Sequence, residues 1–319
     1  MAASYLTRRH LLRTTASAMA AGWLAPSWGR ANENVRSAAG MTLGFSTYGM
    51  KSLPVEQALA AIAEIGYDAV EIAARADWDS APANMPPARR QACRGLLADR
   101  GLRLSSLMEH LPPAADDAQH ARDLERLAGV AELGADLAPE RPPLIQTVLG
   151  GGAWEEKNSM FRDRLGDWLA VCRPRNAVLA IKPHRGGALS EPSEAVWLIE
   201  QLGAGKWLKM VYDYSHYAFR NLPLADTVET ALPHTAHIAV KDAVEENGRV
   251  VFQLPGASGA FDYASLLRLF HAGGYQGDIS CEVSGMVSGN PGYDPLAAAR
   301  QCYKNLAPAF AAAGIRREK

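Results

Sequence analysis

Residues 178–184 read VLAIKPH, a short apolar run that ends in a lysine, a proline and a histidine. Three later stretches repeat the pattern of an apolar run with a polar tip: MVYDYSH at 210–216, HIAVKD at 237–242 and DISCEVS at 278–284. Such a run predicts a buried strand, and the polar group after it lies at the rim of the sheet. Because α/β barrels carry their chemistry at strand ends, the four stretches predict one shared site at a barrel mouth.

Strand-like and helix-like runs alternate along the rest of the chain. Four further strands are expected at 43–47, 68–72, 102–108 and 144–149. Helices are expected at 53–66, 86–100, 115–133, 154–172, 191–202, 222–232, 263–272 and 295–313. Eight strand–helix units without an internal break, in a chain of 319 residues with 48% hydrophobic side chains, predict a (β/α)8 TIM barrel over residues 41–315.

Side chains of a strand point alternately to its two faces, so the tips can be assigned a direction. If the tips face the barrel interior, Lys182, Asp213, Lys241 and Glu282 point inward. Branched apolar residues or a cysteine then face the surrounding helices. The same partition holds in all four strands, which favours a cluster of charged groups inside the mouth.

Several motifs together resemble the xylose isomerase-like TIM barrel family of sugar (phosphate) isomerases and epimerases. They are Asp213-x-x-His216, Lys241-Asp242, the Pro255-Gly256 turn before Phe261-Asp262, and Gly274-Tyr275-x-Gly277-x-Ile279-x-x-Glu282. The resemblance spans roughly residues 43–313. It implies a barrel that moves protons between neighbouring sugar carbons. It also implies one divalent metal, held by a strand-five Glu, a strand-six Asp, a strand-seven His and a strand-eight Glu.

The chain departs from the metal-ligand pattern of that family. Asp213 and Glu282 match two ligands, whereas Lys182 stands at the strand-five Glu position and Ala239 at the strand-seven His position. Two carboxylates hold a hard divalent ion weakly, and a nearby ammonium repels it. We therefore expect no tightly bound cofactor. Mn, Mg, Zn or Co remains the alternative if a histidine completes the site, the candidates being His184, His216 and His237.

The preferred mechanism gives the role of the metal to Lys182. Its ammonium is expected between Asp213 and Glu282, where it would polarise a substrate carbonyl or stabilise an enediolate. Glu282 would remove the proton next to the carbonyl, and Glu109 or His216 would return it. Two alternatives stay open for the same lysine: a Schiff base with a keto sugar, or an ion-pair network that only holds the mouth together.

Other side chains near strand ends are candidate substrate contacts. His184 and Arg185 follow Lys182 and suit hydroxyl or phosphate groups, or else cap a helix and face solvent. Glu109 precedes His110 at the end of the third strand, and one of the pair is expected at the mouth. The remaining candidates are Glu71, His237 and Lys241, with three aromatic residues that either stack on a sugar or pack: Tyr48, Trp154 and Tyr214.

The N-terminal residues resemble an export signal. Residues 7–13 read TRRHLLR and precede an apolar run at 14–25 and small residues up to Ala31. We expect a twin-arginine signal peptide at 1–31, a linker at 32–40, recognition by the twin-arginine export machinery and a periplasmic protein. The apolar run is too short for a confident membrane span, so none is expected in the mature protein. A disordered basic leader is the alternative.

Bulk composition excludes some classes of function. The net charge is −1, from 33 basic and 34 acidic side chains, so no field attracts nucleic acid. Four cysteines without a CxxC pair are expected to be buried thiols. Residues 150–152 are three glycines, read as a tight turn rather than a phosphate loop. No dinucleotide fingerprint supports hydride transfer.

The sequence thus predicts an isomerase or epimerase that acts on a keto or aldo sugar or a polyol by proton transfer next to a carbonyl. A lyase or deglycosidase acting on a keto sugar starts with the same step and is the alternative. A non-catalytic sugar-binding protein is the rival from another class. The small-molecule carbohydrate is the expected ligand, and the oligomeric state is left open.

Overall fold

Eight of the apolar runs form a closed barrel of parallel strands in the computed structural model, which describes residues 40–318. The strands are Thr42–Ser46 (β1), Ala69–Ala73 (β2), Arg103–Met108 (β3), Leu144–Thr147 (β4), Val178–Ile181 (β5), Leu208–Tyr212 (β6), Thr235–Val240 (β7) and Asp278–Cys281 (β10). Their order around the barrel follows the chain, and β10 closes it against β1. The predicted (β/α)8 architecture is therefore confirmed.

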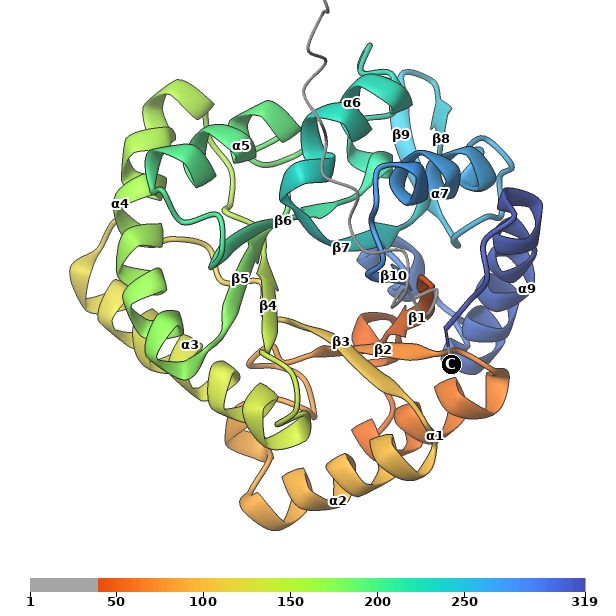
Figure 1. Ribbon diagram of the computed structural model, residues 1–319, viewed down its shortest axis with the longest axis horizontal. Helices are drawn as coiled ribbons and strands as arrows, with labels where there is room; N and C mark the ends of the chain where they lie inside the picture. The colour runs from red at the N-terminus through yellow and green to blue at the C-terminus, as the bar shows by residue number, and fades with distance from the viewer. Residues whose placement is uncertain (1–39, 319) are drawn as a thin grey trace, which may run out of the picture. The chain divides into compact units, whose positions relative to one another are not determined.

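Helices form an outer ring around these strands (Figure 1). They are Val55–Ile65 (α1), Pro87–Asp99 (α2), Asp117–Leu137 (α3), Trp154–Cys172 (α4), Pro192–Gln201 (α5), Leu224–Ala231 (α6), Tyr263–Ala272 (α7), the short Gly285–Ser288 (α8) and Pro295–Ala313 (α9). Short 3-10 helices lie at Thr47–Met50 (η1), Pro82–Asn84 (η2), Arg173–Arg175 (η3), Tyr214–His216 (η4) and Leu232–His234 (η5). Most predicted bounds hold within two or three residues.

The third helix is longer than predicted, because Gly134 does not end it. α3 continues to Leu137. A Cβ at Gly134 would lie 2.4 Å from the Pro143 side chain and 2.9 Å from that of Leu107. The glycine therefore serves the close approach of the helix to the barrel, rather than a helix stop.

A β-hairpin that the sequence analysis did not predict follows β7. Its strands are Asp242–Glu246 (β8) and Arg249–Gln253 (β9), which pair antiparallel. Asn247 and Gly248 join them with φ angles of 52° and 72°, as a two-residue hairpin turn requires. The Asn247-Gly248 pair is the sequence signal from which this hairpin could have been predicted. The hairpin brings Phe252 against His216, with ring centroids 5.7 Å apart.

The alternation of side chains predicted for the strands is present. Ala180, Val211 and Ala239 form a small apolar cluster of their own, separate from the large core between barrel and helices. These three residues stand two positions before Lys182, Asp213 and Lys241. The tips of β5, β6 and β7 are thereby directed into the mouth of the barrel.

Smaller expectations have mixed outcomes. The four cysteines are buried and unpaired, as predicted. Gly150 and Gly152 have φ angles of 84° and 120°, which supports the tight turn. None of the helices in residues 40–318 has the length and apolar character needed to cross a bilayer. The predicted signal peptide at 1–31 and the linker up to residue 39 lie outside the described residues.

Candidate functional site

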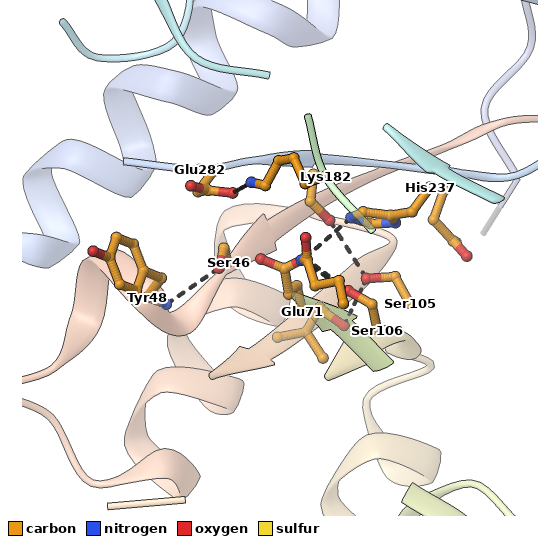
Figure 2. Close-up of polar contacts among 12 residues, drawn as sticks. Ser46, Tyr48, Glu71, Ser105, Ser106, Lys182, His237 and Glu282 are labelled. Atoms are coloured by element: carbon orange, nitrogen blue, oxygen red, sulfur yellow. Dashed lines mark hydrogen bonds and ion pairs between the residues drawn. The ribbon is translucent and has the colours of Figure 1, made fainter. Parts of the chain in front are cut away.

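Four charged side chains meet at the carboxyl ends of β5, β6, β7 and β10. They are Lys182, Asp213, Lys241 and Glu282, each at most 5% exposed. The Lys182 Nζ lies 2.5 Å from Glu282 Oε2, a contact drawn in Figure 2. The Lys241 Nζ lies 2.7 Å from Glu282 Oε1 and 3.1 Å from Asp213 Oδ2. Two ammonium groups and two carboxylates therefore form one buried, electrically balanced cluster.

Two lysines contact both carboxylates. Lys182 does so as expected, at 2.5 Å from Glu282 Oε2 and 3.8 Å from Asp213 Oδ2, but Lys241 is the closer of the two to Asp213. Lys182 pairs mainly with Glu282 and lines the mouth cavity, whereas Lys241 bridges both acids behind it. The expected contacts of Lys182 are therefore present, whereas Lys241, named as a substrate contact, does not line the cavity.

The ion pairs keep both acids ionised. Burial alone would raise the pKa of Glu282, but the ammonium groups of Lys182 and Lys241 outweigh it and lower this pKa to about 2. The pKa of Asp213 is lowered in the same way, against the effect of burial, by Lys241 and Lys182. Burial opposes the charge of Lys241, yet Asp213 and Glu282 raise its pKa. Asp213, Glu282 and Lys241 are therefore all charged at neutral pH.

His216 lies behind this cluster on η4. Its Nε2 is 3.2 Å from Lys241 Nζ and 3.4 Å from Asp213 Oδ2. Complete burial, followed by the charge of Lys241, lowers the pKa of His216 well below its usual range. The ring is therefore neutral, and Nε2 accepts from the ammonium. His216 supports Lys241 and does not line the mouth cavity.

A cavity of about 80 Å³ opens at the mouth beside Lys182 and Glu282. Its other walls include Tyr48, His110, Gln146 and His184. A volume of this size holds a few waters or one end of a small molecule. A larger cavity of about 530 Å³ lies at the opposite end of the barrel, lined by Thr42, Asp68 and Arg103. We place the candidate site at the small one, because barrel enzymes act at the carboxyl ends of their strands.

His184 and Arg185, which follow Lys182 and Pro183 in the chain, have different positions. His184 lines the cavity, and its Nδ1 accepts from the Gly186 N–H at 3.2 Å. Burial, then the charges of Lys241 and Lys182, lower the pKa of His184 to about 4, so the neutral ring carries its proton on Nε2. Arg185 instead donates to the Ser215 carbonyl at 3.2 Å. It ties two loops together and is not on the cavity wall.

At the end of β3 the cavity residue is His110. Glu109 was named as a substrate contact and proton donor, but it is fully buried and pairs with Arg126 of α3. Burial, partly offset by Arg126, raises the pKa of Glu109 to about 7. The alternation that starts at Ser106 and Met108 directs His110 inward. Applied to this strand, it would have identified His110 from the sequence.

Glu71 and His237, two further predicted substrate contacts, lie inside the barrel and are not among the residues that line the cavity (Figure 2). Both are fully buried, and His237 Nε2 is 3.1 Å from Glu71 Oε2. Ser106 Oγ donates to the same carboxylate at 2.7 Å, and the Gln146 amide donates to it from above. Gln146 lines the cavity, whereas Glu71 and His237 do not. Neither residue is positioned to touch a ligand in the mouth.

Of the three aromatic candidates, Tyr48 alone lines the cavity within residues 40–318. Trp154 packs edge-on against Trp197, and Tyr214 against Phe261. Trp154 and Tyr214 therefore have the packing role that was the alternative to stacking on a sugar.

The comparisons with known proteins agree with this architecture. A model of the family described as "Xylose isomerase-like TIM barrel" matches residues 59–306. The chain belongs to the xylose isomerase-like TIM barrel family. Comparison with curated proteins finds no match.

Solved structures of the same fold include sugar epimerases. An L-ribulose 3-epimerase is 17% identical over 86% of this chain and 96% of its own, with a TM-score of 0.68. A 3-keto-D-glucoside 4-epimerase from E. coli is 16% identical over 84% and 99%, with a TM-score of 0.66. In a fusion of such a barrel with 4-hydroxyphenylpyruvate dioxygenase, this chain covers 43% of the longer protein. At these identities the likeness shows the fold alone.

A xylose isomerase-like barrel from Mycobacterium smegmatis, 17% identical over 86% of this chain and 97% of its own with a TM-score of 0.64, is a complex with magnesium. The residues of the present chain do not fit a tightly held ion of this kind. Asp213 Oδ2 and both Glu282 oxygens already contact ammonium groups, which a cation would have to displace. Within residues 40–318 no three His, Cys, Asp or Glu side chains are arranged for a metal.

Proposed function

We propose that this xylose isomerase-like protein is a sugar isomerase or epimerase that transfers a proton next to the carbonyl of a keto or aldo sugar. The observation that carries the proposal is the contact of 2.5 Å between Lys182 and Glu282 on the wall of the mouth cavity. A cation and a carboxylate side by side supply the two groups that carbonyl-assisted proton abstraction needs. The sugar epimerases among the structural neighbours support the same class.

In this mechanism the substrate carbonyl oxygen accepts a hydrogen bond from Lys182. The adjacent C–H bond breaks, its proton goes to Glu282, and its electron pair forms the enediolate, whose negative oxygen the ammonium stabilises. Lys182 must turn from Glu282 towards the substrate. Because that ammonium is one of the two causes of the low pKa of Glu282, its departure makes the carboxylate a stronger base.

Return of the proton falls to groups on the cavity wall. His184 carries its proton on Nε2 and lines the cavity with His110, so these rings replace Glu109 and His216 as candidate donors. His216 is assigned to positioning Lys241. A Schiff base on Lys182 stays the alternative, and borohydride reduction with a keto sugar would then leave a mass adduct on that lysine.

Two further parts of the sequence interpretation remain proposals. The reaction is proposed to need no metal, since ammonium groups occupy the carboxylate oxygens. The mature protein is proposed to work in the periplasm after twin-arginine export, which the arginine pair at Arg8 and Arg9 supports. Cell fractionation and N-terminal sequencing test the second point: mature protein beginning at Asn32 supports it, and an intact cytoplasmic chain opposes it.

Deuterium exchange tests the proposed reaction. The mature protein is incubated in heavy water with a panel of keto and aldo sugars, and deuterium next to the carbonyl is followed by NMR. We expect exchange with at least one sugar, and a loss of about 10²–10⁴-fold in Glu282→Gln. Glu109→Gln, the same change off the cavity, is the matched control and should retain exchange. Absence of exchange throughout would favour a sugar-binding protein without catalysis.

A further inference from the structure

A second hollow of about 510 Å³ has the wall residue Tyr48 in common with the mouth cavity. We call it the side groove. It lies between η1 and α8, and its walls include Tyr48, Lys51, Ser52, Ser288, Asn290 and Tyr293. Tyr48 also lines the mouth cavity, and its ring lies on the Glu282 side of the barrel in Figure 2. The two hollows therefore share one wall, next to the proposed base.

The sizes of the two hollows differ in a way that matters for the substrate. Small-molecule sites usually enclose about 300–1,000 Å³. The mouth cavity, at about 80 Å³, is well below that range, whereas the side groove, at about 510 Å³, lies within it. The mouth thus has room for the reacting carbonyl end, and the groove has room for a further part of the same molecule.

The lining of the side groove favours an uncharged, hydroxyl-rich ligand. Among its described lining residues, Lys51 alone is charged. Its Nζ is paired with Asp77 at 2.6 Å and lies 4.2 Å from the ring centre of Trp78. Within residues 40–318, the groove lining therefore offers no unpaired cation to bind a phosphate or carboxylate. The hydroxyls of Ser52 and Ser288 and the Asn290 amide can bond sugar hydroxyls in either direction.

The walls of the groove are held in place without a ligand. Tyr293 Oη donates to the Gly49 carbonyl at 2.9 Å, which joins the loop after α8 to η1. Gly285 lies against Tyr48, since a Cβ there would come within 3.1 Å of the tyrosine hydroxyl. A groove with fixed walls binds at a lower entropic cost than one that has to form.

We infer that the substrate is an uncharged keto glycoside of at least two sugar units, with the reacting unit in the mouth cavity and the next unit in the side groove. The inference rests on the proposed function for the reacting unit. The groove residues then determine specificity, without taking part in proton transfer.

The test compares a keto disaccharide, isomaltulose or lactulose, with D-fructose. Deuterium exchange gives kcat/KM for each, and calorimetry on Glu282→Gln gives binding. We expect the disaccharide to be preferred at least tenfold. Ser288→Trp, which fills the groove, should remove that preference by lowering the exchange and the binding of the disaccharide. Ser52→Trp repeats the test from the other wall, and Ser159→Trp on the exposed face of α4 is the matched control.

The outcomes separate this inference from the proposed function. Equal exchange of both sugars, unchanged by either groove variant, overturns the inference and leaves the isomerase intact. Disaccharide binding that Ser288→Trp abolishes, without exchange of either sugar, overturns the proposed reaction and supports the groove. Failure of both disaccharides to bind or exchange, with D-fructose active, overturns the groove.

Discussion

Lys241 Nζ lies 2.7 Å from Glu282 Oε1, so the proposed base is held from behind by a second ammonium that does not face the cavity. Lys182 contacts the other oxygen of the same carboxylate from the cavity side. The two lysines are therefore unequal. In the proposed mechanism Lys182 exchanges Glu282 for a substrate oxygen, whereas Lys241 keeps its contacts with Asp213 and Glu282.

This inequality predicts different effects of removing each amine. Lys182→Met should lower kcat/KM by about 10²–10³-fold, because the oxyanion loses its cation, while Lys241 still pairs both acids. Lys241→Met should cost about 3–5 kcal/mol of unfolding free energy, since it removes the close partner of the buried Asp213 carboxylate and leaves only Lys182 at 3.8 Å. Activity assays and urea unfolding of both variants measure the contrast. Equal loss of stability in the two would indicate a purely structural ion-pair network.

The pKa of Glu282 predicts an acid-sensitive fold. It is about 2 in the folded chain, against an ordinary value of 4.5, so the unfolded chain takes up the proton first as the pH falls. The stabilising contribution is complete above about pH 4.5 and is lost progressively as the pH falls towards 2. Urea unfolding between pH 7 and pH 3 should show this decline, and Glu282→Gln should reduce its slope. If the unfolding free energies of the wild type and Glu282→Gln fell with the same slope, the low pKa of Glu282 would be contradicted.

Glu109 predicts a pH dependence of the opposite sign. Burial raises its pKa to about 7 in the folded chain, from 4.5, so the folded state holds this proton more tightly than the unfolded one. Its contribution is present below about pH 4.5 and is lost as the pH rises through 7. Between pH 5 and pH 8 the unfolding free energy of the wild type should therefore fall relative to Glu109→Gln. A difference in unfolding free energy between the wild type and Glu109→Gln that stays constant from pH 5 to pH 8 would argue against a raised pKa of Glu109.

Metal removal should leave the activity unchanged. The carboxylate oxygens that would bind an ion are paired with Lys182 and Lys241. Elemental analysis of purified protein is expected to find less than one equivalent of Mn, Mg, Zn or Co, and exchange rates should persist after treatment with a chelator. Loss of exchange on chelation, restored by one of these ions, would reverse the prediction and return Asp213 and Glu282 to the role of ligands.

Sequence reasoning succeeded where the signal is local. The order of strand and helix follows from hydrophobic periodicity and turn residues, and the period of two along a strand directs Asp213 and Glu282 inward. It was less successful beyond the strand ends. Glu109 was preferred to His110, and the hairpin after β7 was overlooked although its Asn-Gly turn is visible in the chain.

The sequence by itself determined the barrel and the four charged tips at its mouth, because each depends on residues a few positions apart. Only the tertiary structure decided which lysine lies closer to Asp213, that Glu71 and His237 pair inside the barrel, and that a side groove shares Tyr48 with the mouth cavity. The physical reason is the length and flexibility of the lysine side chain. A lysine amine can meet any charge within several ångströms of its strand end, so its partner is set by the register of neighbouring strands and by the loops packed above them.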